Sequence, residues 1–183
     1  MTNRTLCQED FLSKVQKLAE GDKYQAILLR EKDLPQELYE QLAKQVLNIM
    51  TRCNKKCILH FYPDVAVRLK HPYLHLPLPV WEQMPEERRH ELRNEIVQMG
   101  TSVHSPEQLK KAISMKADYV IAGHVFPTEC KKGLAPRGVG FLHEICKQSR
   151  IPVYAIGGIT QEREELVRQQ GADGVCYMSA AMR

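Results

Sequence analysis

The sequence predicts an α/β fold in which helices cover a parallel sheet. Seven strand-like apolar segments alternate with about as many helical segments along the 183 residues. Several of these strands are apolar at consecutive positions, which is typical of parallel strands covered on both faces. A doubly wound sheet and a (β/α)8 barrel both fit this alternation. Near-uniform repeats, with no GxGxxG motif after the first strand, favour the TIM-type barrel.

In the first half, apolar stripes and terminal residues define the helices. Residues 8–20 carry apolar side chains at helical spacing and end at Gly21. Pro35 opens a second helix, and Pro85 with the acidic residues after it opens a later one. Between them, 64–70 is expected to form a short helix, and the two prolines of 77–79 predict a loop. The strands expected in this half are 24–30, 57–62, 73–76 and 98–103.

In the second half, polar caps mark where helices begin. Ser105 and Thr160 each stand where an N-cap residue is expected, before helices at 107–115 and 161–170. A further helix is expected at 139–148. The strands expected in this half are 119–122, 151–156 and 174–178.

Composition limits the class of protein. With 43% hydrophobic and 26% charged residues, the chain should form a single domain over 1–183 with a substantial core. No run approaches the roughly 20 apolar residues of a membrane span, and the N-terminus has no signal-peptide pattern, so a soluble cytoplasmic protein is expected. The six cysteines should then be free thiols. A net charge of +4 without a basic tract argues against nucleic-acid binding.

Two strand ends are candidate phosphate sites. Gly157 and Gly158 follow one strand and lead into a helix, so bare backbone N–H groups and the helix dipole could meet an anion. The last strand ends at Ser179 and Ala180, and in barrels the last two loops commonly share one phosphate. The alternative is that the glycines only form a tight turn.

Three ionisable residues are candidates for chemistry at strand ends. His124 follows an apolar strand beside a glycine and could exchange protons near neutral pH, although such a histidine is often structural. Arg30 could hold a carboxylate or phosphate at two points, and Lys131 could add a point charge. The spacings CNKKC and HPYLH complete no metal site, so no metal is expected.

Several long motifs are shared with a known family. They are GHVFPTECKKGLAPRGVGFL, IPVYAIGGIT and GADGVCYMSA, supported by LLREKD and SVHSPEQL. With these motifs the chain resembles the thiamin phosphate synthase superfamily, and within it the TenI branch, the thiazole tautomerases. The resemblance covers most of the chain and implies a (β/α)8 barrel, in agreement with the pattern of elements.

The resemblance also separates the branches. The synthases carry a GPVFPT-like motif, whereas His124 stands at that proline, as in the tautomerases. The synthases also hold magnesium and pyrophosphate with carboxylates at places that are His60-Phe61 and 77–80 in this chain. The resemblance therefore implies a cofactor-free isomerase that aromatises a carboxythiazole phosphate. In it His124 would move the proton. Gly157, Gly158, Ser179 and Ala180 would hold the phosphate, and Arg30 with Lys131 would neutralise the acidic end.

The two ends of the chain depart from the family. The triplet that follows the family's first barrel strand is Thr2-Asn3-Arg4 here, directly after Met1, and Arg183 comes directly after the last strand, where the family has a closing helix. A barrel without its first strand and last helix is therefore expected. A truncated sequence, a partner subunit covering the gap, or an impaired barrel would each account for it, and a homodimer is expected. The alternatives to the tautomerase are a non-catalytic regulatory paralogue that binds a thiazole phosphate, and a thiamin phosphate synthase.

Overall fold

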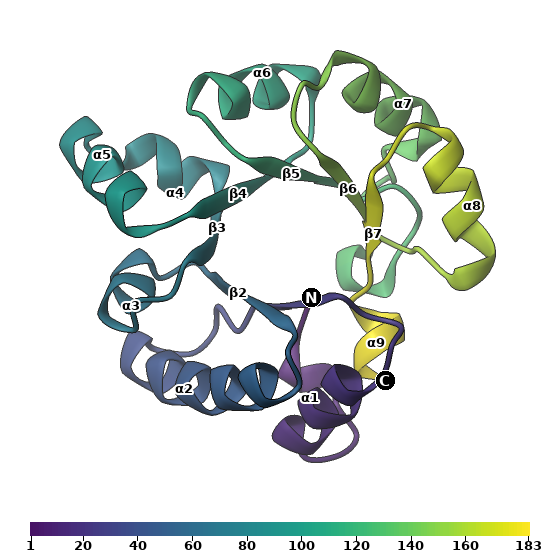
Figure 1. The fold of residues 1–183 in the computed structure, drawn as a ribbon. Helices are drawn as coiled ribbons and strands as arrows, with labels where there is room; N and C mark the ends of the chain where they lie inside the picture. The colour runs from purple at the N-terminus through teal and green to yellow at the C-terminus, as the bar shows by residue number, and fades with distance from the viewer. The chain divides into compact units, whose positions relative to one another are not determined.

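The computed structural model describes residues 1–183, which divide into two compact units. The first comprises 1–76, 83–98 and 181–183, and the second comprises 77–82 and 99–180. Helices lie beside parallel strands in both units (Figure 1). The expected single domain over 1–183 stays a prediction. No helix combines the length and apolar composition that a membrane crossing requires.

The first unit is built on three parallel strands. β1 (Ala26–Leu29) pairs with β2 (Lys56–His60), and β2 pairs with β3 (Tyr73–Pro77), with His60 opposite His75. Helix α2 (Gln36–Arg52) lies alongside β2 (Figure 1). The other helices here are η1 (Arg4–Leu6), α1 (Phe11–Glu20), α3 (Pro63–Arg68) and α5 (Glu86–Glu95).

Four parallel strands form the second unit. β5 (Tyr119–Gly123) lies between β4 (Gln98–Val103) and β6 (Val153–Ile156), and β7 (Gly174–Cys176) pairs with β6. Helix α7 (Gly138–Gln148) packs on β5 and β6, and α8 (Gln161–Gln169) packs on β7 (Figure 1). The remaining helices are α4 (Leu78–Gln83), α6 (Pro106–Ser114), η2 (Glu129–Lys131) and α9 (Ser179–Met182).

Helix starts follow the capping residues of the sequence. The side chain of Asp10 accepts a hydrogen bond from the backbone N–H of Ser13, and α1 begins directly after it. Ser105 likewise accepts from the N–H of Gln108 at the start of α6. Each bond satisfies a backbone donor that the first turn leaves without a partner.

Buried residues tie the strands to their helices. All five residues of β5 are buried. In the first unit, the hydroxyl of Tyr39 on α2 donates to the carbonyl of Leu29 at 2.9 Å and accepts from the N–H of His60 at 2.8 Å. Burial raises the pKa of Tyr39, so the hydroxyl stays protonated and can make both bonds.

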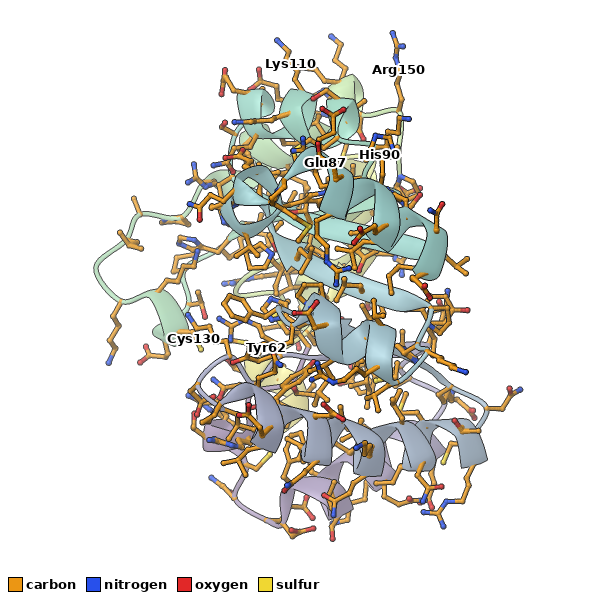
Figure 2. All side chains as sticks on the ribbon, turned by 90° about the vertical axis from the view of Figure 1, so that its left-hand side faces the viewer. Tyr62, Glu87, His90, Lys110, Cys130 and Arg150 are labelled. Atoms are coloured by element: carbon orange, nitrogen blue, oxygen red, sulfur yellow. The ribbon has the colours of Figure 1, made fainter.

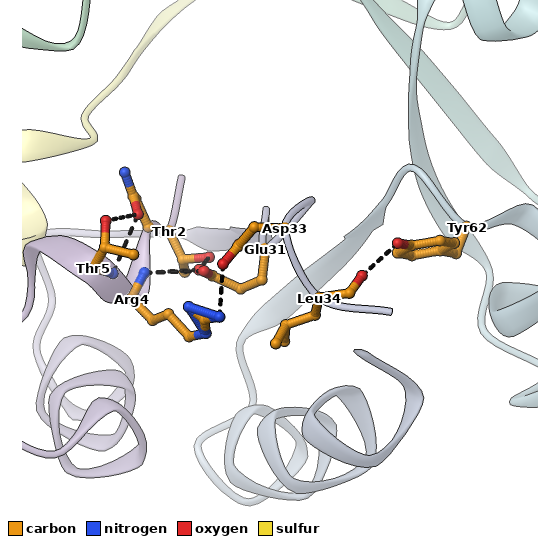
Figure 3. A network of polar contacts seen from close by, with 8 residues as sticks. Thr2, Arg4, Thr5, Glu31, Asp33, Leu34 and Tyr62 are labelled. Carbon is orange, nitrogen blue, oxygen red and sulfur yellow. Dashed lines mark hydrogen bonds and ion pairs between the residues drawn. The ribbon is translucent and has the colours of Figure 1, made fainter. Parts of the chain in front are cut away.

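The N-terminus is fixed to the end of β1 by a network of polar contacts (Figure 3). The N–H of Thr2 donates to the carbonyl of Leu28 at 2.9 Å, and its hydroxyl donates to Glu31 at 2.6 Å. The N–H of Arg4 also donates to Glu31, and the Arg4 guanidinium pairs with Asp33 at 2.6 Å. Burial raises the pKa of Glu31, and this effect outweighs the hydrogen bonds from Thr2 and Arg4, which lower it. The triplet Thr2-Asn3-Arg4 therefore builds a contact with the turn after β1.

The fold class that the sequence predicts is confirmed. Seven parallel strands alternate with helices, as in a TIM-type barrel that lacks parts. The six cysteines are free thiols, as expected. One local expectation was wrong. Residues 77–79 form no loop: Pro77 ends β3 and helix α4 begins at Leu78, because Pro79 falls in its first turn, where a missing N–H costs nothing. The four-residue helix α9 follows β7.

Candidate active site

His124 follows β5 directly, at the carboxyl end of the strand. Its side chain is buried, with 6% of the residue exposed, and neither ring nitrogen has a hydrogen-bond partner. Leaving a buried polar group unpaired costs about 1–3 kcal/mol, and such exceptions in a folded protein call for an explanation. An imidazole with two unpaired nitrogens can accept a proton at one atom and donate one at the other. His124 is therefore the group in this unit most suited to proton transfer.

The glycine turn after β6 packs directly against His124. The N–H of Val125 donates to the carbonyl of Ile156, and that of Phe126 donates to the carbonyl of Gly157, both at 2.9 Å. A Cβ atom added to Gly157 would stand 2.3 Å from the Cβ of His124. Gly157 and Gly158 both have positive φ, at 106° and 61°. The sequence requires glycine here because the backbone must pass this close to His124.

The turn is also held from the side of α8. Arg163 donates from its guanidinium to the carbonyl of Gly158 at 2.8 Å, and it lies 4.7 Å from the centre of the Phe126 ring. The N-terminus of α8 follows the turn by two residues. The structure thus places the glycine turn, a helix start and His124 in one region. That the turn binds a phosphate stays a prediction.

The long loop after β5 returns to the same region. The N–H of Arg137 donates to the carbonyl of His124 at 3.0 Å, which closes the loop onto the strand end. Lys131 lies on η2 within this loop and is exposed. Next to it, Cys130 stands on the part of the loop that projects outward (Figure 2). The Cys130 thiol lies 3.4 Å from the hydroxyl of Ser179, the first residue of α9, and Ala180 follows it. The binding roles of Lys131, Ser179 and Ala180 stay predictions.

His104 is a residue of this site to which the motifs assign no role. It follows β4, and its Nδ1 makes a short hydrogen bond to the carbonyl of Gly123. Burial lowers the pKa of His104, and the positive charges of Lys131 and Arg137 lower it further. In the sequence, the only signal for His104 is its position at the end of an expected strand. That position predicts where His104 lies but not which groups it contacts.

Arg30 belongs to the first unit, directly after β1. Its backbone N–H donates to the hydroxyl of Thr2 at 2.9 Å. In the same unit, His60 ends β2 and His75 lies opposite it within β3, and their rings stack with centroids 5.8 Å apart. Burial is the main cause of the low pKa of both, and the positive charge of Arg30 lowers both further. The substrate-binding role of Arg30 stays a prediction.

The histidines on β2 and β3 do not fit magnesium. Magnesium binds carboxylate and other oxygen ligands, whereas His60 at the end of β2 and His75 within β3 offer imidazoles that burial keeps neutral. No group of three or more His, Cys, Asp or Glu side chains in the chain could hold a metal ion.

The buried histidines predict acid destabilisation. The pKa of His75 is lowered to about 3, so between pH 6.5 and 3 the unfolded chain binds a proton there that the folded chain excludes. The contribution of the neutral His75 to stability is therefore fully present above pH 6.5, and below it the free energy of unfolding falls by about 1.4 kcal/mol per pH unit. His60 acts in the same direction. Urea unfolding at pH 7, 6, 5 and 4 should show this slope.

His75→Gln should flatten the slope, whatever its effect on stability at pH 7. His90→Gln is the matched control, because His90 lies in the same unit with 72% of its side chain exposed. An unchanged slope in His75→Gln would contradict the assignment.

A family model described as thiamine monophosphate synthase matches residues 1–181. The chain belongs to this family. The thiamine monophosphate synthase family thus accounts for both units.

Curated relatives in this family are thiamine-phosphate synthases. One from Pyrococcus horikoshii is 33% identical over the whole chain, which covers 84% of that protein. One from Methanobrevibacter smithii is 31% identical, again over the whole chain and 85% of that protein. One from Lysinibacillus sphaericus is 38% identical over 78% of the chain, which spans 66% of that protein's length.

A solved structure agrees. The thiamine phosphate pyrophosphorylase from Pyrococcus furiosus has a TM-score of 0.83 and 30% identity, over 99% of this chain and 84% of that one. These comparisons confirm the superfamily that the motifs indicate. They also confirm that members of this family act in thiamin biosynthesis. The printed names are those of synthases. They support the synthase alternative better than the tautomerase, which the comparisons leave unconfirmed.

Proposed function

We propose that this chain is a thiazole tautomerase of thiamin biosynthesis, an isomerase that needs no cofactor. One observation carries the proposal. A buried imidazole with two unpaired nitrogens stands at the end of β5, packed against the glycine turn after β6. A proton-shifting enzyme requires such a group within reach of a bound substrate.

The proposed reaction moves one proton. His124 takes a proton from one carbon of a non-aromatic carboxythiazole phosphate and delivers a proton to another carbon of the same molecule. Substrate and product have the same composition, so no co-reactant is needed. Aromatisation makes the step downhill, and the protein has only to hold the substrate and carry the proton.

Binding would use the residues that surround His124. Backbone N–H groups of Gly157, Gly158, Ser179 and Ala180 are proposed to hold the phosphate. Lys131 is proposed to neutralise the acidic end of the substrate. Arg30, in the other unit, keeps the same role as a separate proposal.

A thiamin phosphate synthase is the second candidate, and the names of the relatives favour it. That reaction joins a thiazole phosphate to a pyrimidine with release of pyrophosphate. The imidazoles of His60, at the end of β2, and His75, within β3, argue against it, because they offer no oxygen ligands to magnesium. His124 has no evident role in that reaction.

Two assays on the purified chain decide between the candidates. The tautomerase predicts that the chain accelerates the rise in ultraviolet absorbance as the non-aromatic carboxythiazole phosphate becomes aromatic. The synthase predicts magnesium-dependent release of pyrophosphate from the thiazole phosphate and the pyrimidine pyrophosphate. A rate no higher than that in buffer alone would rule out the tautomerase proposal. Calorimetric binding of the aromatic product without turnover would point instead to the non-catalytic paralogue. A homodimer is still expected, and light scattering on the same sample measures it.

A further inference from the structure

The backbone on either side of His124 is held at four points, and one of them is a side chain. The carbonyl of His124 accepts from the N–H of Arg137, and both backbone groups of Val125 are paired with other backbone groups. The carbonyl of Gly123 accepts instead from the imidazole of His104. Among these four contacts, only the one from His104 can be removed by a substitution that leaves the backbone unchanged.

His104 stands where the β4–β5 ladder stops. The pairing of these strands ends with Val103 opposite Ala122, whereas β5 continues beside β6 until Gly123 lies opposite Ile156. On the β6 side Gly123 is closely packed, since a Cβ atom there would stand 2.4 Å from the carbonyl oxygen of Ile156. On the β4 side the imidazole of His104 replaces the next backbone partner. The peptide that leads into His124 is therefore held between β6 and His104.

The acceptor fixes the state of His104. A carbonyl oxygen can only accept, so Nδ1 of His104 carries the proton. Its lowered pKa keeps the ring neutral, which leaves Nε2 without a proton. His104 therefore holds the Gly123 carbonyl as a hydrogen-bond donor, through Nδ1–H.

The backbone of His104 is also held in place. Its backbone N–H donates to the side chain of Gln108 at 2.7 Å, and the N–H of Gln108 donates to Ser105, the N-cap of α6. These bonds tie the residue after β4 to the first turn of a helix. A donor on such a rigid junction can set the position of its acceptor.

We propose that His104 is a positioning residue of this site. Its Nδ1–H fixes the Gly123 carbonyl and so orients the peptide that carries His124. The kinetic part of this inference rests on the proposed function, whereas the structural part does not. Misplacing a catalytic group by about 1 Å can cost about 10²-fold in rate.

Three variants of the full chain test the inference. The amide nitrogen of His104→Asn falls near the place of Nδ1, that of His104→Gln falls near the place of Nε2, and His104→Ala has no donor. We expect kcat of the Gln and Ala variants to fall by about 10²-fold with KM nearly unchanged, and the Asn variant to stay within about threefold of the parent. If the Ala variant fails to fold, the Asn and Gln pair still decides.

Two measurements separate this inference from the proposed function. The carbonyl ¹³C resonance of Gly123 and the ring resonances of His124 should match the parent in the Asn variant and move in the Gln and Ala variants, whether or not the chain turns over substrate. An Asn variant as impaired as the Ala variant in both readouts overturns the positioning role. Parent-like resonances in all three variants overturn it as well. If the resonances follow the expected order and the parent chain shows no turnover, then the tautomerase fails and the positioning role stands.

Discussion

His124→Asn is expected to lower kcat of the proposed tautomerisation by about 10²- to 10⁴-fold, the contribution usually made by a positioned acid–base group. Asparagine keeps a polar side chain of similar reach, but its amide does not exchange protons near neutral pH. The loss should fall on kcat, because the phosphate contacts proposed at Gly157 and Gly158 do not involve the imidazole. The ultraviolet assay measures it directly.

The matched control is His143→Asn. His143 is exposed on α7 in the same unit, so the same change of side chain there should leave kcat within about twofold of the parent, as surface substitutions usually do. Stability of both variants is compared by urea unfolding. A folded His124→Asn chain that retains the parent's rate would remove His124 from the mechanism and leave the tautomerase without its proton carrier.

The elements were predictable wherever burial and capping agree in the sequence. The strand expected at 98–103 matches β4 (Gln98–Val103), and the helix expected after Thr160 begins at Gln161. The helix begins there although the side chain of Thr160 makes no capping hydrogen bond, so the apolar pattern of the segment carries the prediction. The strand expected at 151–156 is shorter, Val153–Ile156, because Pro152 supplies no N–H for a ladder bond.

The site was predictable only in part. Position at a strand end placed His124 and Gly157 in one region, because parallel strands deliver their carboxyl ends to the same edge. The contact between His104 and Gly123 was not predictable, since it joins residues 19 positions apart through a side chain. The same holds for the stacked His60 and His75, whose pairing depends on the register of two strands.

Gly157→Ala is expected to have the largest effect on stability. The new Cβ would stand 2.3 Å from the Cβ and 2.6 Å from the Cα of His124, and the residue would keep a φ of 106°. Overpacking typically costs about 1–3 kcal/mol and a left-handed backbone another 1–2 kcal/mol, so the free energy of unfolding should drop by about 2–5 kcal/mol. Urea unfolding at pH 7.5 measures it, and kcat should fall with it because relief of the contact displaces His124.

Two glycines of the same unit separate crowding from backbone strain. Gly133 has a φ of 82° with nothing within 4 Å of an added Cβ, so Gly133→Ala carries only the backbone cost of about 1–2 kcal/mol. Gly140 lies in α7, also with open space around it, and Gly140→Ala should raise stability by about 0.5–1 kcal/mol. The excess loss in Gly157→Ala over Gly133→Ala then measures the contact with His124. An excess near zero would mean that the turn can move away from His124, and the close packing that defines this site would no longer explain why two glycines stand there.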